Sequence, residues 1–185
     1  MLKKTWFYVA PVVLAGVMVT AYALMGAEAG TDFKGNFKAK DANGDGFIDR
    51  GEMIAEMTRE AAEIDLPPAC DGTELARRYT FSPEVLADGQ FDFADANKDG
   101  LLTLEETVAA FERKRADDFL QADVDSNGYV TLTELTDAYR ADEVKVSAAC
   151  REAIGMQGAA RAPEILAFLD RDGDNQVSLR EFVNH

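Results

Sequence analysis

Four stretches of this chain share one pattern of oxygen-bearing side chains, which is the pattern of a metal-binding loop. Each stretch is twelve residues long, begins with Asp, ends with Glu, and has an oxygen-bearing side chain at positions 3, 5 and 9. A hard cation such as Ca²⁺ takes about six to eight oxygen ligands, and a loop with this spacing can supply them. The stretches, here called loops 1 to 4, are Asp41–Glu52, Asp95–Glu106, Asp123–Glu134 and Asp170–Glu181.

The predicted side-chain ligands occupy the same five positions in every loop. Loop by loop they are Asp41, Asn43, Asp45, Asp49 and Glu52; Asp95, Asn97, Asp99, Thr103 and Glu106; Asp123, Asp125, Asn127, Thr131 and Glu134; and Asp170, Asp172, Asp174, Ser178 and Glu181. Loops 1 and 4 have the most carboxylates at these positions. Position 9 is acidic in loop 1 alone, and the Thr or Ser in the other loops is expected to act through water. We therefore expect Ca²⁺ sites of unequal strength.

The sixth position of each loop is where the backbone must turn sharply. Loops 1 to 3 have a glycine there, namely Gly46, Gly100 and Gly128, and loop 4 has Asn175. Glycine adopts a positive φ without steric cost, and Asn tolerates it better than other residues that carry a side chain. Loop 4 is therefore predicted to bind Ca²⁺, but with a less favourable backbone turn than loops 1 to 3.

The residues around the loops have the apolar spacing of helices. A large apolar residue lies four residues before each first Asp, at Phe37, Phe91, Phe119 and Leu166, and apolar residues resume after each loop. This spacing places one apolar face on each flanking helix. The aliphatic residues at position 8 favour a short antiparallel bridge between neighbouring loops; they are Ile48, Leu102, Val130 and Val177.

With these loops and flanks, residues 31–185 resemble the EF-hand calcium-binding proteins of the calmodulin superfamily, and in particular exported four-EF-hand proteins of the bacterial type. The resemblance implies an all-α fold of four helix–loop–helix units whose loops pair through short β bridges. It also implies that the Glu at position 12 binds through both oxygens. Position 7 would contribute a backbone carbonyl, which assigns that role to Phe47, Leu101, Tyr129 and Gln176.

The loops are unevenly spaced, which predicts how they pair. Only 16 residues, Thr107–Ala122, separate loops 2 and 3, and one helix of that length spans about 24 Å. We predict that this helix is shared, so that loops 1 and 2 form one pair and loops 3 and 4 the other, with domains at residues 30–114 and 115–185. The alternative is a compact single domain resembling the sarcoplasmic calcium-binding proteins.

The connectors inside the two pairs are long, and each contains one cysteine, Cys70 or Cys150. In an oxidising compartment two cysteines suggest one disulfide, whereas in the cytosol they would be buried thiols. The connectors are predicted to form short extra helices. Pro83 and Pro163 are each expected at the first position of a helix.

Residues 1–29 are predicted to be a secretory signal peptide. A basic start at Lys3 and Lys4 precedes an uncharged apolar stretch that ends in an Ala-Glu-Ala cleavage signal at residues 27–29. The alternatives are an uncleaved membrane anchor and, less favoured, a buried core helix. The protein is expected to be periplasmic or secreted, or else anchored to the membrane and facing out of the cytosol.

The composition restricts the function that the loops can serve. A formal net charge of −15 argues against nucleic-acid binding. The only His is His185, the last residue, and no nucleophile or phosphate-loop motif is present, so no enzyme is predicted. We expect a Ca²⁺ buffer or a Ca²⁺-stabilised protein.

The first alternative is a sensor that exposes an apolar groove to a protein partner. Methionines suit such a groove, but only Met53, Met57 and Met156 remain after the leader. A basic run at residues 113–115 is expected to be a solvated helix face rather than a docking site.

The second alternative is a lanthanide-binding EF-hand protein. The loops of lanthanide-binding EF-hand proteins typically have Pro at position 2. This chain has Ala42, Ala96, Val124 and Arg171 there.

Overall fold

The computed structural model describes residues 33–63, 66–73, 76 and 82–183. The predicted signal peptide, with its alternatives of an anchor or a core helix, lies outside these residues, and so does His185. In the part of the chain that is described, no helix is both long enough and apolar enough to cross a membrane.

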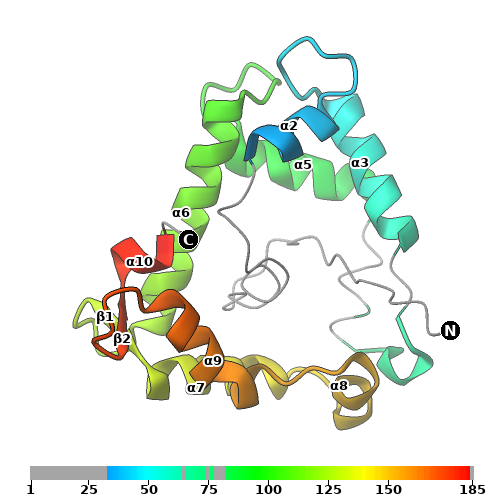
Figure 1. Ribbon diagram of the computed structural model, residues 1–185. Helices are drawn as coiled ribbons and strands as arrows, with labels where there is room; N and C mark the ends of the chain where they lie inside the picture. The colour runs from blue at the N-terminus through cyan, green and yellow to red at the C-terminus, as the bar shows by residue number, and fades with distance from the viewer. Residues whose placement is uncertain (1–32, 64–65, 74–75, 77–81, 184–185) are drawn as a thin grey trace, which may run out of the picture.

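Helices make up most of the structure, as predicted for an all-α fold (Figure 1). The elements in chain order are α2 (Phe33–Lys40), α3 (Arg50–Glu63), the 3₁₀ helix η1 (Pro68–Cys70), α5 (Pro83–Ala94), α6 (Leu104–Ala122), β1 (Tyr129–Thr131), α7 (Leu132–Glu143), α8 (Ala148–Ile154), α9 (Gly158–Leu169), β2 (Gln176–Ser178) and α10 (Leu179–Val183). Loops 1 to 4 each lie between two of the α-helices, which confirms the helix–loop–helix arrangement.

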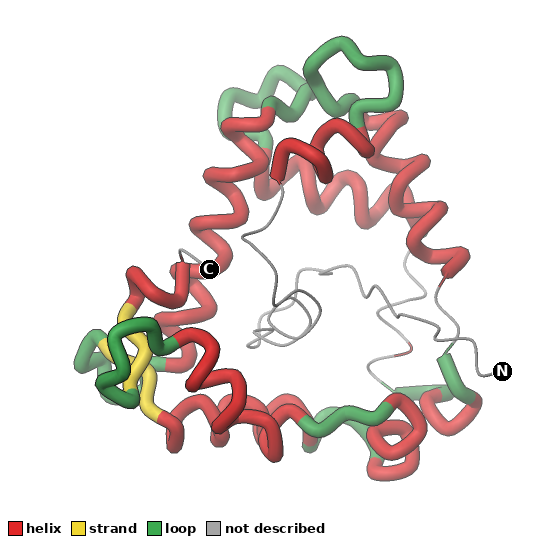
Figure 2. The backbone as a smooth tube through the Cα atoms, viewed as in Figure 1, coloured by secondary structure: helices red, strands yellow, loops and turns green. Residues whose placement is uncertain are grey.

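The loops pair two by two through their eighth residues. In pair 1, which holds loops 1 and 2, Ile48 and Leu102 form an antiparallel bridge with N–H···O distances of 2.9 and 3.0 Å. In pair 2, which holds loops 3 and 4, β1 and β2 run antiparallel with Val130 opposite Val177 (yellow in Figure 2). All four side chains are buried, so each bridge also closes one end of a hydrophobic core.

Each pair has its own hydrophobic core. The core of pair 1 contains Phe37, Ile48, Met53, Met57, Ala87, Ala94, Leu102 and Ala110. The core of pair 2 contains Phe119, Ala122, Val130, Leu135, Tyr139, Ala162, Ile165, Leu166, Leu169, Val177 and Phe182. The apolar residue four positions before each loop belongs to one of these cores or packs against it, as its spacing predicts.

Helix α6 belongs to both pairs. It has 19 residues, which corresponds to about 28 Å, and it runs without a break from loop 2 to loop 3 (Figure 1). Its N-terminus is a capping box: the Thr103 hydroxyl accepts the Glu106 N–H at 3.1 Å, and the Glu106 carboxylate accepts the Thr103 N–H at 3.0 Å. Ala110 lies in the first core and Phe119 in the second. The predicted domain boundary at residues 114 and 115 falls within this helix and stays a prediction.

The two connectors meet through Cys70 and Cys150. The structure joins these residues in a disulfide, with the Cα atoms 4.6 Å apart, and both side chains are fully buried. Val146 completes this small cluster, and Leu66 and Met156 pack against it. The connectors contain η1 and α8 in their described parts, so they form short helices as predicted, and these two helices lie side by side (Figure 1).

One of the two predicted helix starts is wrong. α5 begins at Pro83 with Ser82 as its N-cap, as expected. α9 instead begins at Gly158, one turn and more before Pro163, which therefore lies inside the helix. The earlier start depends on contacts with α7: the Glu143 carboxylate accepts the Ala159 N–H at 2.9 Å, and Gly158 packs against the ring of Tyr139 so closely that a Cβ would come within 2.7 Å. A cap supplied by another helix leaves no local sequence signal.

Candidate metal-binding loops

The Glu at position 12 is held at both ends of its loop by hydrogen bonds. In loop 3, Glu134 Oε1 accepts the Val124 N–H at 3.1 Å, while its Oε2 accepts the Thr131 N–H at 2.9 Å. The same two-ended arrangement recurs at Glu52, Glu106 and Glu181. Hydrogen bonds from the protein itself therefore hold this carboxylate in place over the loop.

The Asp at position 1 is fixed from the opposite side of the loop. One of its carboxylate oxygens accepts the N–H of the residue at position 6, at 2.9 to 3.0 Å in every loop. The donors are Gly46, Gly100, Gly128 and Asn175. Because this amide points inward, the chain curls around the first carboxylate and brings the later oxygens toward it.

Two left-handed residues produce this curl, and sequence reasoning identified only one of them. At position 6, φ is 89°, 81° and 89° at Gly46, Gly100 and Gly128, and 63° at Asn175, so Asn does adopt the left-handed turn expected of it. Position 4 is also left-handed in all four loops, at Gly44, Lys98, Ser126 and Gly173. In loops 1 and 4 the glycine at position 4 indicates a left-handed residue. In loops 2 and 3 Lys98 and Ser126 occupy that position, and their residue types do not indicate it.

Position 9 has a structural role that the ligand pattern alone did not reveal. Thr103 and Thr131 are the N-caps of the helices that follow their loops, and the Ser178 hydroxyl accepts the Glu181 N–H at 3.3 Å. In loop 1, an Asp49 carboxylate oxygen accepts the Glu52 N–H at 2.8 Å. The signal was the Ser/Thr-x-x-Glu spacing of a capping box at positions 9 and 12. Each loop therefore ends in a self-capped helix start.

Carboxylates converge most closely in loops 3 and 4. Oxygens of Asp123, Asp125 and Glu134 lie within 4.8 Å of one another, and so do oxygens of Asp170, Asp172 and Asp174. Among the described residues, loops 1 and 2 form no carboxylate group as tight, because both have an Asn at position 3, which offers an amide oxygen instead of a carboxylate. A donor set made only of oxygen atoms fits Ca²⁺. The assignment of individual ligands stays a prediction for every position.

The hydrogen bonds also lower the pKa of three position-12 carboxylates, those of Glu106, Glu134 and Glu181. The backbone N–H and hydroxyl of Ser178 lower the pKa of Glu181 to about 2 from an ordinary 4.5, and bonds from Thr103 lower the pKa of Glu106. At Glu134 burial acts to raise the pKa, but hydrogen bonds from Thr131 and the loop backbone outweigh it, and the net shift is downward. These groups therefore remain negative in mildly acidic solution, as a cation site requires.

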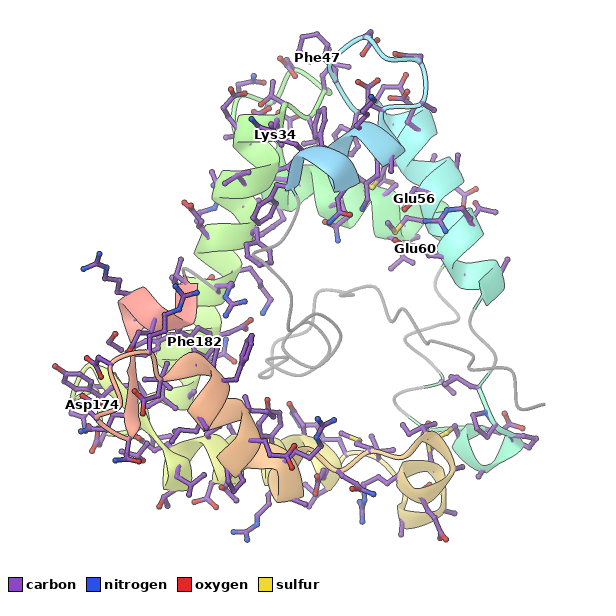
Figure 3. The ribbon with its side chains drawn as sticks, viewed as in Figure 1. Lys34, Phe47, Glu56, Glu60, Asp174 and Phe182 are labelled. Atoms are coloured by element: carbon purple, nitrogen blue, oxygen red, sulfur yellow. A yellow bond between two sulfur atoms is a disulfide. The ribbon has the colours of Figure 1, made fainter. Side chains whose placement is uncertain are left out.

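Loop 4 is followed by α10, whose described part is the five residues Leu179–Val183. Its Phe182 is buried against α6, edge-on to Phe119 with the ring centroids 5.6 Å apart. Phe182 is labelled in Figure 3 where α10 meets α6, and Asp174 marks loop 4 nearby. Packing on the shared helix thus holds α10, and with it the end of loop 4, in place.

The basic run at residues 113–115 is neither fully solvated nor a free docking site. The Arg113 guanidinium donates to the Phe93 carbonyl at 2.8 Å and lies over the Phe93 ring. Lys114 pairs with the buried Asp118 one turn later. Arg115 lies over the rings of Phe111 and Phe182, with the guanidinium carbon 5.6 and 5.1 Å from the centroids. All three cations are engaged within the protein.

The geometry defines a class of protein, a helical protein with paired metal-binding loops, and comparison with known proteins identifies the family. The EF-hand family model matches residues 37–57, 86–111 and 116–137, which contain loops 1 to 3. Loop 4, with Asn175 in place of glycine, lies outside the matched residues.

Three curated proteins are similar over most of the chain. "Probable calcium-binding protein CML25" from Arabidopsis thaliana is 30% identical over 151 residues, which cover 79% of this chain and 68% of the relative. "Probable calcium-binding protein CML21" from Oryza sativa subsp. japonica is 28% identical over 153 residues, covering 79% and 73%. The rabbit (Oryctolagus cuniculus) "Mitochondrial adenyl nucleotide antiporter SLC25A24" is 26% identical over 175 residues, but these cover 93% of this chain and only 31% of that protein. The chain belongs to the EF-hand family of calcium-binding proteins.

Proposed function

We propose that this protein is exported and binds Ca²⁺ in all four loops, as a buffer or as a protein whose fold the ions stabilise. The observation that carries this proposal is the shared hydrogen-bond frame, in which every loop fixes its first Asp and its last Glu in the same way. Bound Ca²⁺ supplies positive charge among clustered carboxylates that otherwise repel one another. Binding to the folded state alone stabilises that state by mass action. No catalytic role is proposed.

The scarcity of methionines after residue 29 and the links between the two pairs support stabilisation over sensing. Met53 and Met57 are 4% and 8% exposed within the core of pair 1, and Met156 packs against the disulfide cluster. A sensor of the calmodulin type would have to expose such side chains on binding Ca²⁺. The pairs are also linked twice, by α6 and by the Cys70–Cys150 bond, which would restrict a large opening motion.

The proposed location outside the cytosol is supported by two features. Residues 1–29 have the sequence of a signal peptide, and a buried disulfide is expected to persist in an oxidising compartment. We propose a periplasmic or secreted protein, with a membrane-anchored form as the alternative. Mass spectrometry of the protein purified from a producing cell distinguishes them, because a cleaved chain begins at Gly30 and an anchored chain keeps Trp6.

Calorimetric titration of the mature protein with Ca²⁺, together with a dye that fluoresces on apolar surface, tests the function. We expect four ions and no rise in dye fluorescence. Glu106→Gln should remove one ion, whereas the matched variant Glu105→Gln, at the neighbouring exposed position, should keep four. Binding of no ions would overturn the proposal, and a strong rise in dye fluorescence would favour the sensor.

The sensor alternative is favoured by one observation. Leu120, at the end of α6, and Val124, in loop 3, are 65% and 77% exposed, so they offer apolar surface to a partner.

For the lanthanide alternative, Tyr129 is a natural probe because it lies in loop 3 and is 42% exposed. Tb³⁺ bound in loop 3 should luminesce when Tyr129 is excited, and displacement by La³⁺ but not by millimolar Ca²⁺ would favour lanthanide selectivity.

A further inference from the structure

Three side chains on α6 form a stripe that runs from one loop pair to the other. Phe111, Arg115 and Phe119 are spaced four residues apart, so they lie along one face of the helix. Phe33 of α2, in pair 1, packs edge-on against Phe111 with the ring centroids 4.9 Å apart. Phe182 of α10, in pair 2, packs on Phe119 at the other end of the stripe.

Arg115 is the central member of this stripe, and its charge lies against two aromatic rings. Its guanidinium lies over the ring of Phe111 and over the ring of Phe182. Its Nε is buried and has no hydrogen-bond partner among the described residues, and burial lowers the pKa of the guanidinium. An Arg stays protonated even so, and a desolvated cation over aromatic faces is strongly attracted to them. Arg115 therefore connects the two sets of rings.

Both ends of this connection lead directly to predicted ligands. Phe182 is the residue after Glu181, the last carboxylate of loop 4. α6 begins within loop 2, where Glu106 is the third residue of the helix and part of its capping box. A shift of Glu181 must move Phe182, and Phe182 contacts the same helix that carries Glu106.

We propose that Arg115 is a positioning residue that couples site 4 to site 2 across the two pairs. The inference rests on the proposed Ca²⁺ binding and adds to it an energetic link between sites that share no loop bridge. Filling of site 4 fixes Phe182 against Arg115, Arg115 holds α6 in one orientation, and that orientation favours an ordered Glu106. By linkage, filling of site 2 must favour site 4 to the same degree.

The amides at position 6 give a separate probe for each site. Each donates to the Asp at position 1, so its NMR signal should shift when that carboxylate binds an ion; Gly100 reports site 2 and Asn175 reports site 4. We expect Glu181→Gln to abolish the Asn175 response and to raise the Ca²⁺ midpoint of Gly100 by about fivefold, near the low end of typical couplings. In an Arg115→Met background, Glu181→Gln should leave the Gly100 midpoint unchanged.

Two further variants separate coupling from simple packing. Arg113→Met is the matched control, because Arg113 contacts the ring and the carbonyl of Phe93, which belongs to pair 1. This variant should leave the fivefold effect intact. Arg115→Lys keeps a cation over the rings and should keep part of the effect, even if Arg115→Met weakens the fold. If Asn175 and Gly100 both respond to Ca²⁺ but Glu181→Gln shifts Gly100 equally with and without Arg115, the coupling role is refuted. If neither amide responds, it is the proposed Ca²⁺ binding that fails.

Discussion

Removal of the Cys70–Cys150 disulfide should destabilise the protein substantially. The bond closes a loop with a sequence separation of 80 residues. In the chain-entropy model a loop of this length restricts the unfolded state by about 4.5 kcal/mol at 25 °C. The double variant Cys70→Ala/Cys150→Ala keeps both Cβ atoms, and the small cluster with Val146 can partly close around the lost sulfurs. We therefore expect a loss of about 3 to 5 kcal/mol in the free energy of unfolding.

Urea unfolding, followed by circular dichroism in the presence of a chelator, measures this loss without a contribution from bound ions. The slope of the transition should also rise, because the unfolded chain without a cross-link exposes more surface. Wild-type protein measured in the presence of excess reductant is the control and should show about the stability of the double variant. A loss below about 1 kcal/mol would refute the argument, since the bond would then restrict the unfolded chain very little.

Three other predictions concern single side chains. Asn175→Gly should stabilise the metal-free protein by about 0.5 kcal/mol, because φ is 63° there, and Gly128→Asn should have the opposite sign in the same urea assay. The pKa of Glu181 is lowered to about 2 from 4.5, so its contribution to stability is present above pH 4.5 and is lost as the pH falls toward 2. Thermal unfolding of metal-free protein between pH 5 and 2.5 should therefore be less pH-dependent in Glu181→Gln than in wild type. Tyr139→Phe should be neutral or stabilising by up to about 1 kcal/mol, because the hydroxyl is buried and has no hydrogen-bond partner among the described residues; a clear loss in urea would contradict this.

The features that local sequence determines were predictable. The shared helix follows from the short interval between loops 2 and 3, and the loop bridges follow from aliphatic residues at position 8, such as Ile48 and Val130. Asn175 adopts the left-handed turn because its side chain allows it. In each case the cause lies within a few residues of the effect, so that spacing and residue type were sufficient.

The features that required another part of the chain were not predictable. The start of α9 depends on Glu143 and Tyr139 of α7. The environment of Arg115 depends on Phe182, 67 residues later, so a run of three basic residues could only be read as solvated. Position 4 was missed for a different reason: Lys98 and Ser126 accept a left-handed conformation that their residue types do not suggest.

The two links between the loop pairs bear on what ion binding can do. α6 is at once the second helix of loop 2 and the first helix of loop 3, so neither pair can rotate this helix without moving the other. The connectors are joined on the other side by Cys70 and Cys150, and the Ser147 hydroxyl there also donates to the Ala69 carbonyl at 3.5 Å. A ligand can shift a conformational equilibrium only by its difference in affinity for the two states. Because the pairs are linked twice, an open state of this protein would have to bend α6 or separate η1 from α8. We therefore expect the free energy of binding to appear mainly as stability and as coupling along α6.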